Sequence, residues 1–400
     1  MPQISDRGER MPASPIRKLM PYAEKTIKKG IQIYHLNIGQ PDLKTPVEAL
    51  NALKNCNLET ISYSHSAGNE SLRRKMAEYY KKIQIDVSYE DILITVGGSE
   101  AINFAYYCIL NYGDDVLVPE PFYSNYFGFT TETGARMIPV RSTIENGFAL
   151  PPIEEFEKVM TPRTKALMLC NPNNPTGYVY SKEELLQIRD FVKEYDLFLI
   201  SDEVYREFCY EGKHYSVLEL EGIEDNTILI DSFSKRYSEC GIRVGALVSR
   251  NKEIIKTALK FAQARLSPPS LGQIVAEASL DVPQSYLNNA FIEYKSRRDF
   301  IILELNKIKG VYAPMPKGAF YTTVHLPVDD AEEFCIWMLE EFSFNGATVM
   351  LAPGNGFYIG QKIGKQQARI AYVLEIDKLR KAVECLKEAL RVYPKRTIEQ

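Results

Sequence analysis

The sequence contains no long apolar run. No stretch of its 400 residues approaches the roughly 18–20 consecutive apolar residues that a membrane-spanning helix needs. The first residues, MPQISDRGER, are polar and charged, so they do not form the apolar part of a secretory signal. We therefore expect no membrane partner and a cytoplasmic location.

An excess of positive charge is also missing. The chain has 48 basic and 52 acidic residues, which leave a formal net charge of −4. A protein whose main partner is nucleic acid needs surplus basic residues to neutralise phosphates, so we expect no nucleic-acid partner. With 45% hydrophobic and 25% charged residues, the composition is typical of a globular protein, and the length allows two domains.

Cysteine and histidine are few and scattered. The seven cysteines are odd in number, and no pair has CxxC or metal-ligand spacing, so the sequence predicts reduced thiols. The four histidines do not cluster either, which argues against a zinc site. We expect no metal.

Gly/Ser linkers and repeats are absent as well, but short apolar runs alternate with helical patterns. Most of the runs are continuously apolar, as strands buried on both faces of a mainly parallel sheet should be. The seven predicted strands lie at 91–96, 115–119, 135–140, 165–170, 197–201, 227–232 and 244–249. Between two of them, Ser181 and Glu184 form a capping box ahead of a helical pattern. These features predict a doubly wound α/β domain.

After about residue 275 the pattern changes to that of a second, smaller α+β domain. Long helical patterns at 286–310 and 376–393 enclose shorter strand patterns at 319–326, 347–351 and 368–373. We predict an N-terminal segment, 1–45, that joins the small domain. The large domain then spans 46–275 and the small domain 276–400.

Polar residues follow several predicted strands directly. Residues 97–100, Gly-Gly-Ser-Glu, open a helix after the first strand, and the free N–H groups there suit an anion, although a plain strand-to-helix turn would look the same. The segment NPNNPTG (171–177) presents Asn173 and Asn174 after another strand. In a parallel sheet, ligands bind outside the carboxyl ends of the strands.

The last such residues are an acid, a phenol, a lysine and an arginine. Asp202 and Tyr205 follow one strand, while Lys235 and Arg243 follow the next. Each residue alone has an ordinary structural explanation, but the whole set suits pyridoxal phosphate (PLP). This cofactor needs a lysine for its Schiff base, an acid to keep its pyridine nitrogen protonated, and donors for its phenolate oxygen and phosphate.

On these motifs, the sequence resembles the fold-type I PLP-dependent enzymes, specifically the class I/II aminotransferases of the aspartate aminotransferase superfamily. The resemblance covers nearly the whole chain: NIGQPDLKTP (37–46), YSHSAGNESLR (63–73), NPNNPTG, SDEVY (201–205), SFSKRYSECGIRVG (232–245), KGAFY (317–321) and ARIAY (368–372). NPTG, and S-x-S-K with an arginine eight residues on, are its most specific parts. The resemblance implies a homodimeric PLP-dependent aminotransferase with a mainly parallel seven-stranded sheet in its large domain and a smaller α+β domain.

The resemblance also implies the roles of individual residues. Lys235 would form the Schiff base and carry the proton, and Asp202 would pair with the pyridine nitrogen. Asn174 and Tyr205 would donate to the phenolate oxygen. The remaining cofactor-binding residues, most of them around the phosphate, would be Gly98, Ser99, Glu100, Ser232, Ser234 and Arg243.

Other matched positions concern the ring, the partner subunit and the substrate. Tyr123 would stack on the pyridine ring, where many members have tryptophan. Tyr63 would reach the phosphate of the neighbouring subunit, which implies shared active sites. Arg369 would bind the substrate α-carboxylate together with Asn174 and the backbone of Gly39, because the planar guanidinium of arginine can donate two hydrogen bonds to one carboxylate.

The substrate is less well defined by the sequence. Ser99 stands where many bacterial aspartate enzymes of this subgroup have a lysine. Arg265 lies near, but not in register with, an arginine that other members bring in from the second subunit, and an exposed arginine at a helix end would look the same. Arg17 and Lys18 are further candidates for contacting a substrate side chain.

Aspartate with 2-oxoglutarate is our predicted substrate pair. Methionine, glutamine, aromatic amino acids and alanine stay open, as do a β-eliminating C–S lyase and a ring-closing synthase. We do not expect a DNA-binding regulator built on this fold, because the residues before 37 are too few for a helix-turn-helix module.

Overall fold

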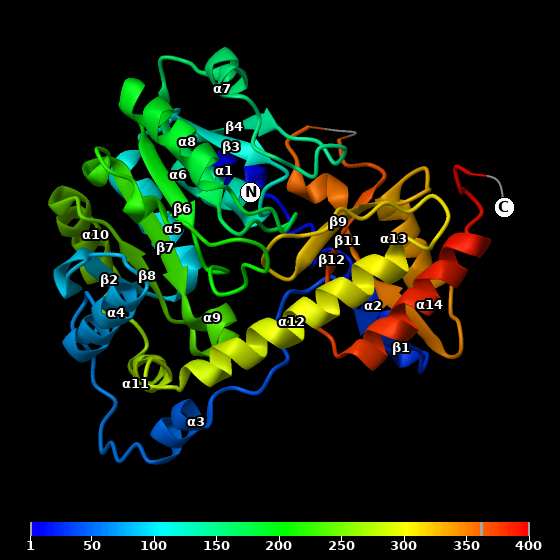
Figure 1. The fold of residues 1–400 in the computed structure, drawn as a ribbon, viewed down its shortest axis with the longest axis horizontal. Coiled ribbons are helices and arrows are strands. Elements are labelled where there is room, and N and C mark those ends of the chain that lie inside the picture. The colour runs from blue at the N-terminus through cyan, green and yellow to red at the C-terminus, as the bar shows by residue number, and fades with distance from the viewer. Residues whose placement is uncertain (1, 361–362, 399–400) are drawn as a thin grey trace.

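A seven-stranded sheet forms the centre of the larger part of the molecule (Figure 1), here described from a computed structural model over residues 2–360 and 363–398. Its strand order is β2-β8-β7-β6-β5-β3-β4. The strands are β2 (Ile92–Thr95), β3 (Asp115–Glu120), β4 (Arg136–Arg141), β5 (Thr164–Cys170), β6 (Phe198–Asp202), β7 (Thr227–Ser232) and β8 (Gly245–Val248). Each overlaps one predicted run, so all seven predictions are confirmed.

The sheet is mainly parallel, as predicted. Strands β3 to β7 run parallel to one another, whereas β8 runs antiparallel to both β2 and β7. Alternate residues of one strand enter different cores: Ile228 and Ile230 pack into one apolar cluster, and Leu229 packs into another. Burial on both faces explains why these strands have continuous apolar sequences.

Helices cover both faces of this sheet (Figure 1). The capping box predicted at Ser181 begins one of them: the Ser181 hydroxyl accepts from the Glu184 N–H at 3.1 Å, and the Glu184 carboxylate accepts from the Ser181 N–H at 2.7 Å. The helices are α4 (Glu70–Lys82), α5 (Gly97–Ile109), α6 (Asn125–Thr133), α7 (Ile153–Val159), α8 (Lys182–Glu194), α9 (Phe233–Arg236), α10 (Lys252–Arg265) and α11 (Ser270–Ser279).

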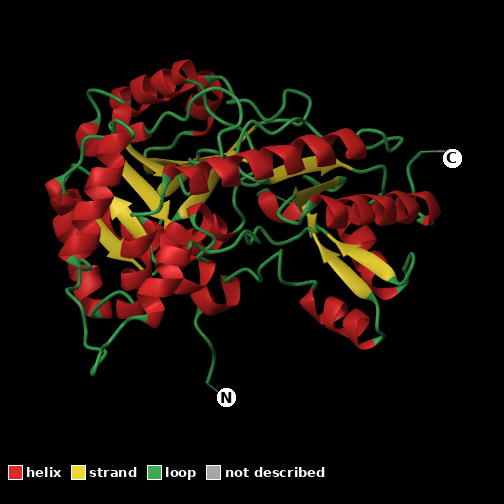
Figure 2. Ribbon diagram, turned by 60° about the horizontal axis from the view of Figure 1, so that its bottom comes forward, coloured by secondary structure: helices red, strands yellow, loops and turns green. Residues whose placement is uncertain are grey.

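Two small sheets lie at the other end of the molecule (Figure 2). One is antiparallel, with the order β11-β12-β9, and the other pairs β1 with β10 in parallel. The strands are β1 (Gln32–His35), β9 (Tyr321–His325), β10 (Ala347–Met350), β11 (Ala352–Pro353) and β12 (Gln367–Ala371). The surrounding helices are α2 (Met20–Lys28), α12 (Gln284–Leu305), α13 (Ala331–Glu340) and α14 (Ile376–Val392).

The N-terminal segment touches both parts of the molecule. Lys18 forms an ion pair with Glu332 of α13 at 2.6 Å, while Arg7, in α1 (Asp6–Arg10), donates to the carbonyl of Glu132 in α6 at 3.0 Å. The segment therefore runs from the large sheet to the small ones. The predicted domain boundaries at 45 and 275 stay a prediction.

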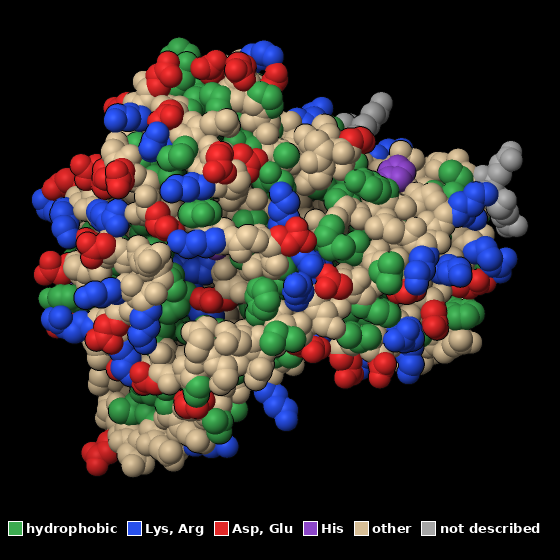
Figure 3. Space-filling view, viewed as in Figure 1, with side chains coloured by type: hydrophobic (Ala, Val, Ile, Leu, Met, Phe, Trp, Pro, Cys, Tyr) green, Lys and Arg blue, Asp and Glu red, His purple; other side chains and the backbone are tan. Residues whose placement is uncertain are grey.

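The remaining elements are short. Helix α3 (Val47–Lys54) protrudes at the lower edge of Figure 1 and packs against α11. Single 3₁₀ turns lie at Tyr89–Asp91, Val217–Glu219, Glu224–Asn226, Cys240–Ile242 and Gly354–Phe357. Figure 3 shows charged side chains of both signs spread over one face of the molecule. Within the described residues, no helix has the length and apolar character needed to cross a membrane.

Candidate active site

A cavity of about 620 Å³ lies at the carboxyl ends of strands β5, β6 and β7. We call it the central cavity. Most of the predicted site residues line it: Gly39, Gly98, Ser99, Tyr123, Asn174, Asp202, Tyr205, Ser232, Ser234, Lys235, Arg243 and Arg369. Residues more than 300 positions apart in the sequence therefore meet at one place.

Lys235 extends into the cavity from the short helix α9, which follows β7 directly. Ser232 caps this helix, since its hydroxyl accepts from the Ser234 N–H at 3.2 Å. The Lys235 Nζ donates to the carbonyl of Gly39 at 2.9 Å. Burial, reinforced by the charges of nearby arginines, lowers the pKa of Lys235. A lowered pKa increases the share of neutral amine, which is the form that attacks a carbonyl.

Asp202 is the last residue of β6 and is buried. Its carboxylate accepts from the Tyr126 hydroxyl at 2.7 Å and from the Val204 N–H at 3.3 Å. Burial raises the pKa of Asp202 to about 6. Within residues 2–360 and 363–398 the carboxylate forms no ion pair, so a cationic group of a ligand, such as a protonated pyridine nitrogen, fits beside it.

The N-terminus of α5 has features that favour an anion. Gly97 opens this helix with φ +74°, and a Cβ atom there would come within 2.4 Å of Nη2 of Arg243. Glycine thus lets the guanidinium lie directly beside the positive end of the helix dipole. Two positive groups at one place favour an anion between them, and the Ser232 and Ser234 hydroxyls, 2.9 Å apart, lie at the same cavity wall. This arrangement fits a phosphate.

Arg369, on β12, forms another wall of the cavity and is only 2% exposed. Its Nη1 donates to Oδ1 of Asn174 at 3.0 Å, and its Nη2 donates to the carbonyl of Asn37. Because the amide oxygen of Asn174 accepts from Arg369, the amide N–H₂ of Asn174 is left to donate elsewhere. The Arg369 Nε has no hydrogen-bond partner in the described part of the chain, as expected of a guanidinium that receives a carboxylate.

Three predicted residues do not line the central cavity of their own chain. Tyr63 lies on the loop before α4 and is 79% exposed. Glu100 accepts from the Val96 N–H at 2.8 Å and forms an ion pair with Nε of Arg265 at 3.5 Å. Arg265 also donates to the carbonyl of Ile94 at 3.3 Å. Glu100 and Arg265 pair with each other and do not line the cavity, so their cofactor and substrate roles stay predictions.

Several residues of the site were not predicted from the sequence. Tyr126, the partner of Asp202, stands three positions after Tyr123, but nothing in its local sequence distinguishes it from a core tyrosine. Tyr321 also lines the cavity, and its membership of the quoted KGAFY segment was a usable signal. Arg17, one of the two N-terminal candidates, lines the cavity too, whereas Lys18 does not.

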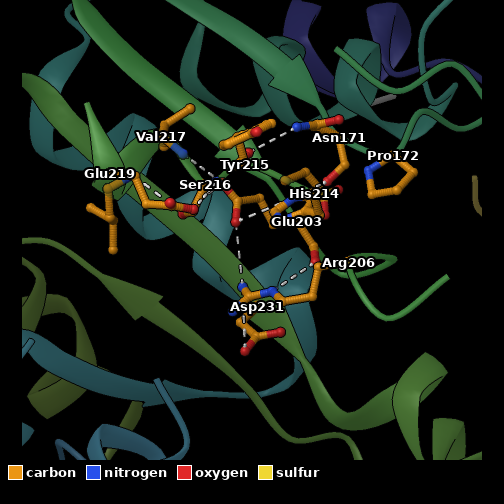
Figure 4. Close-up of polar contacts among 12 residues, drawn as sticks. Asn171, Pro172, Glu203, Arg206, His214, Tyr215, Ser216, Val217, Glu219 and Asp231 are labelled. Atoms are coloured by element: carbon orange, nitrogen blue, oxygen red, sulfur yellow. Dashed lines mark hydrogen bonds and ion pairs between the residues drawn. The ribbon is translucent and has the colours of Figure 1, made fainter. Parts of the chain in front are cut away.

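A network of buried charged and polar side chains surrounds Glu203 and Arg206 (Figure 4). Glu203 accepts from the hydroxyl of Ser216 and the N–H of Val217, both at 3.0 Å. The Arg206 guanidinium lies 3.7 Å from Glu203 and 3.6 Å from Asp231. Burial raises the pKa of Glu203 to about 7, opposed by Arg206. The network joins the ends of β6 and β7, next to Asp202 and Ser232.

Comparison with known protein families matches residues 31–386 to the family "Aminotransferase class I and II". The chain belongs to this family. It is therefore a PLP-dependent aminotransferase, whose substrates are small molecules, namely amino acids and 2-oxo acids. The cavity fits the cofactor, since a lysine, a buried acid and an anion site surround one space.

Relatives of this aminotransferase differ in their named substrates. It is 33% identical to aromatic-amino-acid aminotransferase 2 of Thermococcus litoralis, over 97% of this chain and 98% of the relative. It is 31% identical to an aspartate aminotransferase of Pyrococcus horikoshii, over 97% of each chain. The solved structure of Thermus thermophilus aspartate aminotransferase with maleate superposes with a TM-score of 0.88 at 29% identity, covering 98% of this chain and 100% of the other.

Proposed function

We propose that this aminotransferase transfers the amino group of a dicarboxylic amino acid, with aspartate as the best candidate, to 2-oxoglutarate. The observation that carries the proposal is a pair of guanidinium groups, Arg369 and Arg17, on one cavity. A dicarboxylic substrate has two carboxylates, and each guanidinium can bind one of them. The named activities of the Pyrococcus and Thermus relatives support the same substrate class.

In this proposal the residues of the chain have distinct tasks. Lys235 would hold PLP covalently, Asp202 would face its ring nitrogen, and Asn174 and Tyr205 would donate to its phenolate oxygen. Ser232, Ser234, Arg243 and the α5 N–H groups of Gly98 and Ser99 would hold its phosphate. When bound, PLP withdraws electrons from the Cα atom of the amino acid. The Lys235 Nζ, with its lowered pKa, would take the proton from Cα and deliver it to a carbon of the cofactor, as transfer of the amino group requires.

Arg17 is the residue that would bind the side-chain carboxylate of a dicarboxylic substrate. Its side chain lines the cavity and, across the ranges 2–360 and 363–398, forms no hydrogen bond or ion pair. Lys18, the next residue, is instead held by Glu332. A guanidinium that has no partner among the described residues can take a carboxylate of the substrate without breaking a contact to any of them.

Aromatic amino acids are the second candidate substrates. The cavity also has apolar walls, formed by Ile16, Ile38, Ile102 and the ring of Tyr123. The Thermococcus relative is named for aromatic substrates. An aromatic side chain would use these walls and leave Arg17 without a partner.

Replacing Arg17 tests the choice between these substrates. For Arg17→Ala we expect kcat/KM to fall about 100-fold for aspartate and glutamate and to change by less than about threefold for alanine and phenylalanine, because only the acids leave a carboxylate unpaired. The assay is a panel of amino acids with 2-oxoglutarate, with 2-oxo acid formation and ammonia release measured separately.

The matched control is Lys18→Ala, which removes a neighbouring cation that does not line the cavity. It should leave the substrate pattern unchanged. Equal losses on all substrates in Arg17→Ala, or none, would contradict the dicarboxylate proposal. Ammonia as the main product would instead indicate an eliminating enzyme.

We also propose a homodimer with shared sites, in which Tyr63 contacts the phosphate bound by its partner. Large apolar side chains around Tyr63 support an interface there. Five of these side chains are more than 40% exposed to solvent: Val47, Leu50, Leu53, Leu58 and Ile61. Such a concentration on one segment is typical of a surface that another chain covers.

A further inference from the structure

Tyr321 connects residues from separate parts of the central cavity. Its hydroxyl lies 3.0 Å from the hydroxyl of Tyr205 and donates to the carbonyl of Gly39 at 3.5 Å. The same carbonyl accepts from Nζ of Lys235. The Tyr321 hydroxyl is thus one contact away from Lys235.

The ring of Tyr321 has a second neighbour, the guanidinium of Arg369. The Arg369 Cζ lies 4.6 Å from the centroid of the ring. The two residues stand on adjacent antiparallel strands, β9 and β12, and each is 2% exposed. A cation over an aromatic face is attracted to it, and more strongly when both groups are desolvated, so the ring holds the guanidinium in place.

Gly39 leaves the space that the Tyr321 hydroxyl occupies. A Cβ atom on Gly39 would lie 1.7 Å from the Tyr321 oxygen, far inside any tolerable contact. Any other residue at position 39 would force the hydroxyl away from Tyr205. The geometry of the pair therefore depends on glycine at this position.

Proton counting indicates what the hydroxyl of Tyr321 does. Tyr205 has one hydroxyl proton, so it cannot donate to Tyr321 and to a ligand oxygen at the same time. When Tyr205 donates into the cavity, Tyr321 can turn its own proton from Gly39 to the Tyr205 oxygen. Hydrogen bonds in such a chain polarise one another, which strengthens the donation by Tyr205. Burial raises the pKa of both phenols, so both keep their protons.

We propose that Tyr321 is a positioning residue with two separable roles: its hydroxyl supports Tyr205 as a donor to the phenolate oxygen of PLP, and its ring fixes Arg369 for the substrate α-carboxylate. The inference rests on the proposed roles of Lys235, Tyr205 and Arg369. Two substitutions separate its parts. Tyr321→Phe removes the hydroxyl and keeps the ring, while Tyr321→Leu removes both.

Tyr321→Phe tests the hydroxyl by spectroscopy. Donors to the phenolate oxygen lower the pKa of the nitrogen that would link PLP to Lys235. Weaker donation by Tyr205 should therefore raise the pH midpoint of the visible absorbance of bound PLP by about 0.5 unit. Tyr205→Phe should raise the midpoint further. The double variant should match Tyr205→Phe alone, because Tyr321 acts through Tyr205. The KM for amino acids should stay within about twofold of wild type in Tyr321→Phe, since the ring remains.

Tyr321→Leu tests the ring by kinetics. Loss of the aromatic face should raise KM about tenfold or more for amino acids and 2-oxo acids alike, because every substrate has the carboxylate that Arg369 binds. If the leucine variant does not fold, Tyr321→Met replaces it and fills more of the ring's volume without an aromatic face. The matched control is Tyr372→Phe. It removes a buried hydroxyl that donates to the carbonyl of Ala319 at 3.3 Å, outside the cavity, and should move neither readout.

Three results would overturn the inference. One is an unchanged midpoint in Tyr321→Phe while Tyr205→Phe shifts it, and another is a shift in the double variant that exceeds the shift in Tyr205→Phe. The third is an unchanged KM in the folded leucine or methionine variant. A wild-type protein that shows no visible absorbance with PLP would instead overturn the proposed function, and the inference with it.

Discussion

Replacing Asp202 with asparagine is expected to lower kcat about 10³-fold or more while PLP still binds. Asparagine keeps the shape of the side chain and can still accept from Tyr126, but it lacks the charge that keeps a ring nitrogen protonated. Without that proton the cofactor withdraws electrons weakly. Steady-state kinetics and the absorbance of bound PLP measure the two effects separately. The control Tyr126→Phe removes the hydrogen bond to Asp202 and keeps the charge, so its loss should be much smaller.

The Asp202 carboxyl should also make PLP binding depend on pH. Burial raises its pKa to about 6 in the cofactor-free protein, from an ordinary 3.8. Because the folded protein ionises this carboxyl less readily than the unfolded chain does, the cofactor-free protein loses stability as the pH rises from 3.8 towards 6. Pairing with a protonated ring requires the ionised form, so affinity for PLP should fall as the pH drops below about 6.

Asp202→Asn should lack this part of the pH dependence. The phosphate of PLP also titrates at a pKa of about 6, so the decisive quantity is the difference between wild type and variant, measured by titration with PLP at pH values from 5 to 8. Near-normal kcat in Asp202→Asn would contradict the role of the acid, as would identical pH profiles of binding.

Arg369→Lys is expected to lower kcat/KM about 100-fold or more, by a similar factor for every amino acid and 2-oxo acid. Lysine keeps the positive charge but loses the planar pair of donors that binds a carboxylate at two points. It also cannot reproduce the hydrogen bonds to Asn174 and Asn37. All substrates share the α-carboxylate, so the loss should not depend on the side chain.

This uniform loss separates Arg369 from Arg17, whose replacement should affect only the dicarboxylic substrates. The same substrate panel serves both variants. A loss in Arg369→Lys restricted to aspartate and glutamate would mean that the two arginines have the opposite roles.

The sheet was predictable because its strands are buried on both faces. Burial requires continuous apolar runs, and such runs are visible in a sequence without any knowledge of their partners. The direction of a strand leaves no such trace. Strand β8 runs antiparallel to its neighbours, yet its apolar sequence resembles those of the parallel strands.

The site was predictable where function depends on residues that follow a strand directly. Lys235, Asp202 and Asn174 meet at one cavity because parallel strands end at one edge of the sheet. Contacts between distant side chains are different. The pairing of Glu100 with Arg265 joins the start of one helix to the end of another, and neither residue's local sequence indicates it.

The most direct test of this account is to identify the residue that carries PLP. Purified protein should be yellow, and borohydride reduction followed by peptide mass spectrometry should find the cofactor on Lys235. Lys235→Ala should lose this attachment and nearly all transaminase activity. Reduction that fixes the cofactor to a different lysine, or attachment that persists in Lys235→Ala, would contradict the assignment of the central cavity as the active site.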